Sequence, residues 1–112
     1  MKLAIIVRRD LDMRTGKIAG QVGHASVNAY KYATKEVAHK WYEEGQKKIV
    51  LKVADEQELR TIAKMAIIND LQVWDVHDMG LTQIPANTLT CISIGPDEDA
   101  RIDKVIKDLK LL

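Results

Sequence analysis

One predicted helix carries polar side chains that are suited to chemistry. Five of them recur at spacings of four, three, four and three, and therefore share one helix face: Lys17, Gln21, His24, Asn28 and Lys31. Lys17 stands at the expected N-terminus, where free N–H groups and the helix dipole attract an anion. This polar stripe predicts a site for a phosphate or a developing oxyanion. An ordinary solvated helix face would have the same pattern.

The residues that surround the polar stripe have unusually small side chains. Gly20 and Gly23 lie inside the predicted helix, where each glycine costs about 1 kcal/mol relative to alanine. We therefore expect a neighbouring strand or a ligand to pack closely against them. Arg8, Arg9 and Arg14 lie close in sequence, and their charges would also serve an anion.

A second group of residues suited to chemistry lies in the loop after the third predicted strand. Asp78 ends that strand and is followed by Gly80, Thr82 and Gln83. An Asx-turn closed by Thr82 is the plain structural interpretation. In sheets with parallel strands, however, ligands bind beyond the carboxyl ends of the strands. If the first and third strands run in the same direction, Lys17 and Asp78 should meet at one edge of the sheet.

Several other chemistries are excluded by sequence pattern. A phosphate-binding P-loop reading of residues 11–18 fails because Leu11 replaces its first glycine and Ile18 its magnesium-binding hydroxyl. The 3 histidines are dispersed without zinc-ligand spacing. Cys91 lies within a predicted strand, as a small core residue would. No metal site is therefore expected, and an enzyme of this sequence should use water as its nucleophile.

The apolar periodicity predicts eight elements that position these residues. The strands are expected at 3–7, 48–53, 73–77 and 89–94, and the helices at 17–33, 36–44, 56–69 and after 97. Asp55 and Glu58 form a capping box at the third helix, Gly95-Pro96 is expected to end the last strand, and Asp97 to cap the last helix. The order β-α-α-β-α-β-β-α predicts a three-layer α/β/α sandwich. The connection between the strands at 73–77 and 89–94 is too short for a parallel crossover, so these two strands are expected to pair antiparallel. The sheet is therefore expected to be mixed and four-stranded.

Length and charge narrow the classes of protein. A chain of 112 residues with 46% hydrophobic content fits a single domain over 1–112. The single cysteine favours a reducing, cytoplasmic setting. The net charge of +1 hides an asymmetry, because residues 1–48 hold 10 Lys/Arg against 5 Asp/Glu whereas residues 49–112 hold 7 against 11. This asymmetry points to one basic face, and chance clustering of charges on solvated helix faces would give the same counts.

Several ordered segments resemble the archaeal and eukaryotic (type 2) peptidyl-tRNA hydrolase family. The similar segments cover nearly the whole chain: 16–25 (GKIAGQVGHA), 41–52, 78–84 (DMGLTQI), 88–96, 102–105 and 109–112. Gly20 and Gly23 depart from the pattern, since alanine or cysteine is more usual there. The resemblance implies hydrolysis of the ester between a peptide and the 3′ ribose of tRNA, which recycles tRNA and serves translation quality control. It also implies no metal or organic cofactor, and a homodimer.

The resemblance assigns roles to residues of this sequence. It implies Lys17, Asp78 and Thr82 as the catalytic group, and Gln21, His24 and Thr90 as supporting or substrate-contacting positions. Asp78 would act as base or water orienter, with Thr82 positioning it or the water. Lys17 would neutralise the oxyanion or bind a tRNA phosphate, two roles that the sequence leaves open.

The charge pattern predicts where tRNA would bind. Basic residues of the first half should contact its acceptor end: Arg8, Arg9, Arg14, Lys17, Lys47 and Lys48. Two alternatives to an enzyme remain at this stage. One is a non-catalytic tRNA- or ribosome-associated binding module, and the other is a protein-interaction module on an inherited fold. Intact Lys17, Asp78 and Thr82 favour the enzyme.

Overall fold

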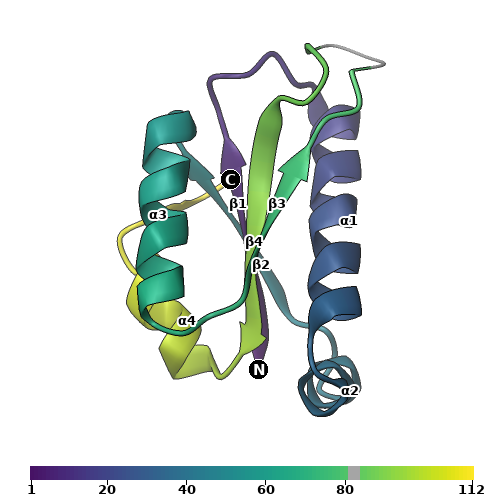
Figure 1. Ribbon diagram of the computed structural model, residues 1–112, viewed down its shortest axis with the longest axis vertical. Helices are drawn as coiled ribbons and strands as arrows, with labels where there is room; N and C mark the ends of the chain where they lie inside the picture. The colour runs from purple at the N-terminus through teal and green to yellow at the C-terminus, as the bar shows by residue number, and fades with distance from the viewer. Residues whose placement is uncertain (81–83) are drawn as a thin grey trace.

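A mixed sheet with helices on both faces forms the molecule in a computed structural model, which describes residues 1–80 and 84–112 (Figure 1). The elements are β1 (Lys2–Arg8), α1 (Thr15–Tyr32), α2 (Lys35–Glu43), β2 (Lys48–Val53), α3 (Glu56–Ile68), β3 (Val73–His77), β4 (Leu89–Asp97), α4 (Asp99–Ile106) and β5 (Lys110–Leu111). The strand order is β3-β4-β1-β2-β5. Among the described residues, β1 and β2 pair in parallel and the other three strand pairs are antiparallel.

The sheet has five strands, so the expected number of four was wrong. The additional strand, Lys110–Leu111, has two exposed residues. It pairs with Leu51 and Lys52 of β2. Two exposed residues cannot display the apolar alternation by which a strand is found in a sequence. The α/β class, the mixed sheet and the antiparallel pairing of β3 with β4 are confirmed.

The central strand β1 explains the layering. Its residues Leu3–Val7 are all 0% exposed, and successive side chains of a strand point to opposite faces. Ala4 and Ile6 therefore pack in one core cluster with residues of α3 and α4, whereas Leu3, Ile5 and Val7 pack in a second cluster with residues of α1 and α2. Figure 1 shows α1 and α2 on one side of the sheet and α3 and α4 on the other.

The N-terminus of α3 follows the predicted capping box. The side chain of Asp55 accepts from the Glu58 N–H at 2.9 Å. The Glu58 carboxylate reaches back and accepts from the Ala54 N–H at 2.9 Å. Two N–H groups at the helix start are thereby satisfied, which fixes where β2 ends and α3 begins.

The end of β4 differs from the prediction. The strand continues through Gly95 and Pro96 to Asp97, which pairs with Lys2 of β1. The ladder is irregular between Lys2 and Ala4, and such bulges are where a strand accommodates a proline without an N–H. Asp97 is therefore the last strand residue, and the α4 N-cap is Glu98.

The expectation that a neighbouring strand packs closely against Gly20 and Gly23 was wrong, and the alternative of a ligand there stays a prediction. A Cβ built on either glycine meets no atom of the described residues within 4 Å. Both glycines lie on the exposed side of α1, whereas Ala25 and Ala29 form its buried contact with the sheet. Within the described ranges, no helix is long and apolar enough to cross a membrane.

Candidate active site

Strand direction brings Lys17 and Asp78 together, as the sequence predicted. Strands β1 and β3 are each antiparallel to β4, so they run in the same direction and their carboxyl ends meet at one edge. Helix α1 starts after β1, and Asp78 follows β3 directly. The Nζ of Lys17 donates a hydrogen bond to Oδ1 of Asp78 and forms an ion pair with it.

Asp78 is held by its own loop. The residue is 2% exposed, and its Oδ2 accepts from the Gly80 N–H at 2.7 Å. Its backbone N–H donates to the Thr88 carbonyl at 2.9 Å, and its carbonyl accepts from the Asn87 N–H at 2.7 Å. One carboxylate oxygen of Asp78 thus accepts from the backbone as in an Asx-turn, and the other faces Lys17. Closure of the turn by Thr82 lies outside the described residues.

Gly80 cannot be replaced without moving this loop. Its φ is +78°, and an added Cβ would lie 2.4 Å from the Cβ of Ala86. Only glycine fits this close approach and this φ. Asn87, at φ +64°, makes the second turn that returns the chain to β4. Sequence analysis missed Asn87 and Thr88 as supports of Asp78, although asparagine before a strand is a turn signal. The predicted catalytic Thr82 lies outside the described residues.

Charge and hydrogen bonding keep Asp78 ionised. The hydrogen bond from Lys17 is the largest cause that lowers the pKa of Asp78 below its ordinary value of 3.8. Burial opposes this effect, and the Gly80 N–H and the charge on His24 reinforce it. At neutral pH the site therefore holds a carboxylate beside an ammonium group.

Gln21 and Thr90 connect α1 to β4 behind this pair. They are 4% and 0% exposed, and the Thr90 hydroxyl lies 2.6 Å from Oε1 of Gln21 and 3.1 Å from the Val76 carbonyl. A β-bulge in β4 allows Thr90 to reach Gln21. Val76 of β3 pairs with Cys91, whereas the next residue, His77, pairs with Leu89, so Thr90 has no partner in β3. The extra residue, Thr90, is turned toward α1. Gln21 lies one helical turn after Lys17, so this contact fixes the helix that carries the lysine.

The other candidates on α1 are exposed. His24 is one turn beyond Gln21 on the exposed side of the helix and is the smallest of the causes that lower the pKa of Asp78. Arg14 is the N-cap residue of α1, and its side chain makes no cap hydrogen bond. Both therefore lie on the part of α1 that borders the Lys17–Asp78 pair.

Arg8 is not brought to the Lys17–Asp78 pair. Its guanidinium is buried and donates to both carboxylate oxygens of Asp10, at 3.0 and 2.8 Å. It also donates to Oε1 of Glu56 at 3.2 Å and to the Leu89 carbonyl at 3.0 Å. The hydrogen bond from Arg8 is the largest cause that lowers the pKa of Asp10. Arg8 thus joins β1, α3 and β4 on the face of the sheet opposite α1.

Lys48 lies at the other end of the sheet. It is the first residue of β2, which runs parallel to β1, so it stands at the amino ends of these strands. Its Nζ donates to the Gln46 carbonyl at 3.0 Å and lies 5.0 Å from the centre of the Trp41 ring. Six residues of strand span roughly 17 Å, so Lys48 is remote from the edge that holds Asp78. A charge count could not distinguish the two ends of a strand.

The remaining chemical groups give no second reactive centre among residues 1–80 and 84–112. Burial raises the pKa of the Cys91 thiol to about 12, so this buried residue is a packing group and not a thiolate nucleophile. No group of three or more His, Cys, Asp or Glu side chains in these ranges could hold a metal ion. The arrangement can supply a carboxylate, an ammonium group and backbone donors to a reaction that uses water.

Comparison with known proteins gives one consistent result. The family model described as "Peptidyl-tRNA hydrolase PTH2" matches residues 1–112. The chain is 46% identical to the peptidyl-tRNA hydrolase of Methanothermobacter thermautotrophicus over 112 residues, which is 100% of both chains. It is 46% identical to that of Thermoplasma acidophilum, covering 99% of this chain and 97% of the relative. It is 47% identical to that of Sulfurisphaera tokodaii, covering 99% and 98%.

Proposed function

The chain belongs to the PTH2 family of peptidyl-tRNA hydrolases, and we propose that it hydrolyses peptidyl-tRNA at the Lys17–Asp78 pair. The reaction is attack of water on the ester that joins the peptide to the 3′ ribose, giving free tRNA and free peptide. The observation that carries the proposal is the buried carboxylate–ammonium pair at the carboxyl edge of the sheet. Its two charges match the two needs of ester hydrolysis, an oriented water and a stabilised oxyanion.

Asp78 orients the attacking water in this mechanism. A carboxylate with a lowered pKa is a weak base, so it accepts a hydrogen bond from the water and takes the proton only as the C–O bond forms. The proton then passes to the 3′ oxygen of the ribose when the tetrahedral intermediate collapses. No covalent enzyme intermediate is formed, because water itself supplies the oxygen that remains on the peptide.

Lys17 stabilises the negative charge of the tetrahedral intermediate. In the free protein its ammonium group is paired with Oδ1 of Asp78 near the N-terminus of α1. The helix N–H groups add to the positive potential there. Loss of such a donor costs about 10²–10³ in kcat in enzymes where it has been measured. We assign oxyanion stabilisation to Lys17, and the kcat of Lys17→Met should therefore fall at unchanged tRNA affinity.

Five further residues have supporting roles in the proposal. Gln21 and Thr90 act as positioning residues, because their buried hydrogen bond fixes α1 against β4. His24 and Arg14, exposed beside the pair, contact the acceptor end of the tRNA. Thr82 positions the water or Asp78, a role that rests on the family resemblance alone.

Single-turnover hydrolysis of an N-acetylated aminoacyl-tRNA tests the function. We expect Asp78→Asn to lower the rate by about 10²–10⁴-fold at unchanged affinity for deacylated tRNA. The matched control is Asp75→Asn, an exposed aspartate of β3, the strand that Asp78 follows, which should retain the wild-type rate. EDTA should leave the rate unchanged. A folded wild-type protein that binds tRNA without cleaving the ester would refute the proposal and favour a binding module.

We also propose that the protein acts as a homodimer in the cytoplasm. The family resemblance supports the dimer, and peptidyl-tRNA arises where translation occurs. Exposed apolar side chains on α1 and α2, among them Val27, Tyr30 and Tyr42, offer a surface for self-association. Sedimentation equilibrium measures the mass directly, and a monomer at micromolar concentration would contradict the dimer.

A further inference from the structure

Two lysines stand directly opposite each other at the open edge of the sheet. Lys52 of β2 and Lys110 of β5 are register partners in an antiparallel pair. Directly opposed residues share one face, with Cβ atoms about 4.5–5.5 Å apart, and like charges in this position are destabilising. Both side chains are exposed. The fold therefore keeps a repulsive pair where a neutral residue would serve stability better.

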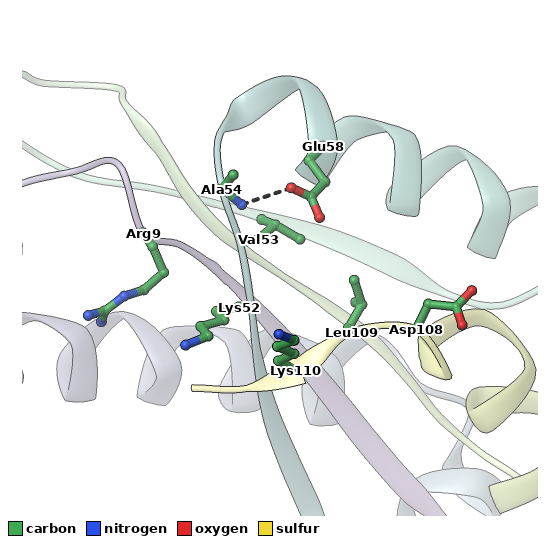
Figure 2. Close-up of a pocket in the computed structure, with 8 residues that line it drawn as sticks. All are labelled: Arg9, Lys52, Val53, Ala54, Glu58, Asp108, Leu109 and Lys110. Atoms are coloured by element: carbon green, nitrogen blue, oxygen red, sulfur yellow. Dashed lines mark hydrogen bonds between the residues drawn. The ribbon is translucent and has the colours of Figure 1, made fainter.

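A third cation joins them, and the described residues supply none of the three with an ion pair. Arg9 follows β1 and lines the same groove, of about 420 Å³, as Lys52 and Lys110. Figure 2 shows these three side chains toward one end of the groove and the carboxylates of Glu58 and Asp108 toward the other. Glu58 is engaged by the Ala54 N–H at the start of α3. The cationic end is therefore not neutralised by the groove itself.

Lys52 and Lys110 stand on the same face of the sheet as the active site. Lys52 is the register partner of Val7, which packs in the core cluster beneath α1, and Val50 packs against that cluster too. The intervening Leu51 belongs to the cluster on the opposite face. Helix α1 packs on β1, β3 and β4, so Lys52 and Lys110 extend this face beyond the helix toward the open edge.

The distance between the two lysines and Asp78 can be estimated from a row of paired residues that crosses the sheet. One residue from each strand lies in register: Val76, Cys91, Val7, Lys52 and Lys110. Strands lie about 4.8 Å apart, so Lys52 is roughly 14 Å and Lys110 roughly 19 Å along the row from Val76. Asp78 follows Val76 by two residues. A nucleic-acid strand whose 3′ ribose lies at Asp78 reaches this far within its last few nucleotides.

We infer that Arg9, Lys52 and Lys110 bind backbone phosphates of the acceptor arm of the tRNA substrate, next to the ester that is cleaved at Asp78. The inference rests on the proposed function for the identity of the nucleic acid. Phosphate is the anion that this groove would meet, and it relieves the repulsion between the two lysines. Contacts of this kind give affinity without sequence selectivity.

The test compares two double variants of equal charge. Lys52→Gln with Lys110→Gln removes the opposed pair, and Lys64→Gln with Lys104→Gln removes two exposed lysines of α3 and α4 on the other face. Deacylated tRNA is titrated by fluorescence anisotropy from low to physiological KCl. With a salt slope of about 0.7 per contact, each contact contributes about fivefold at 0.1 M salt. The first variant should bind about 25-fold more weakly with a salt slope smaller by about 1.4, and the control should match wild type.

Three further measurements sharpen the result. The single-turnover rate at saturating enzyme should stay at the wild-type value, because the lysines do not touch the ester. Lys52→Arg with Lys110→Arg should restore affinity, since the charges remain. The melting temperature of the glutamine variant should not fall, because a repulsive pair has been removed.

Wild-type affinity and salt slope in the Lys52→Gln, Lys110→Gln protein would overturn the inference. So would an equal loss in the control double variant, which would show only a general charge effect. The binding titration needs no catalysis. Failure of the wild-type protein to cleave peptidyl-tRNA would therefore count against the proposed function and would be seen separately from failure of this inference.

Discussion

Arg8→Met removes a guanidinium that joins three elements, and its cost follows from the contacts. Methionine keeps the apolar stem, so the loss comes from the charged head. The variant leaves the buried Leu89 carbonyl without its donor, and an unsatisfied buried acceptor lowers the unfolding free energy by about 1–3 kcal/mol. The side chains of Asp10 and Glu56 are 38% and 44% exposed and regain water, so each ion pair contributes at most about 1 kcal/mol. These contributions add to about 1–5 kcal/mol, and we take the middle of that range, about 2–4 kcal/mol, as the expected loss in unfolding free energy.

Thermal and urea denaturation followed by circular dichroism measure this loss. For a domain of this size about 1 kcal/mol corresponds to about 4 °C, so the melting temperature should fall by about 8–16 °C. The KM for peptidyl-tRNA, measured well below that temperature, should not change. Arg9→Met is the matched control, because the adjacent exposed side chain should alter stability by less than about 0.5 kcal/mol while it weakens tRNA binding. A raised KM at unchanged stability in Arg8→Met would refute the structural role of Arg8.

Four further outcomes are expected. Lys17→Met takes away the main cause of the lowered Asp78 pKa while burial remains, so the acid limb of kcat/KM, below pH 3.8 in wild type, should move to higher pH. The stability that the Asp78 carboxylate contributes is likewise present above pH 3.8 and lost as pH falls through the lower folded pKa, which acid titration of wild type should show. Thr90→Val leaves Oε1 of Gln21 buried without its donor and should cost about 1–3 kcal/mol by urea denaturation, with Thr90→Ser as the control that keeps the hydroxyl. Cys91, whose pKa is raised to about 12, should resist iodoacetamide at neutral pH until urea unfolds the chain, and rapid native labelling would contradict its burial.

The meeting of Lys17 and Asp78 was predictable because it depends on strand direction. The short connection between the third and fourth strands favours an antiparallel hairpin, and the sequence left the shared direction of the first and third strands as a condition. The structure meets this condition because β1 and β3 are both antiparallel to β4. The elements also followed from apolar periodicity, with β2 and β3 at the predicted bounds. Local patterns of about ten residues therefore sufficed for the fold class and for the edge that holds the site.

Other features depend on register, which a single sequence does not reveal. Arg8 and Arg9 are adjacent in sequence, yet one is buried under α3 and the other lines an open groove. Lys48 and Lys52 share a strand and a face but lie at its two ends. The position of Lys110 opposite Lys52 depends on a strand of two residues, which is too short to show an apolar periodicity in the sequence. Charge counting found a basic half of the chain and could not assign its members to faces.

The bulge in β4 ties the length of this strand to the active site. With the extra residue, Leu89 enters one core while Thr90 and Cys91 face α1. Deletion of Thr90 would restore the plain alternation of β4, leave Leu89 in its core cluster opposite His77 and remove the partner of Gln21. Among related sequences, a one-residue gap between the Asp78 loop and Cys91 should therefore coincide with a change at position 21. Gaps at this point of an alignment would mark relatives in which α1 is held by a different contact.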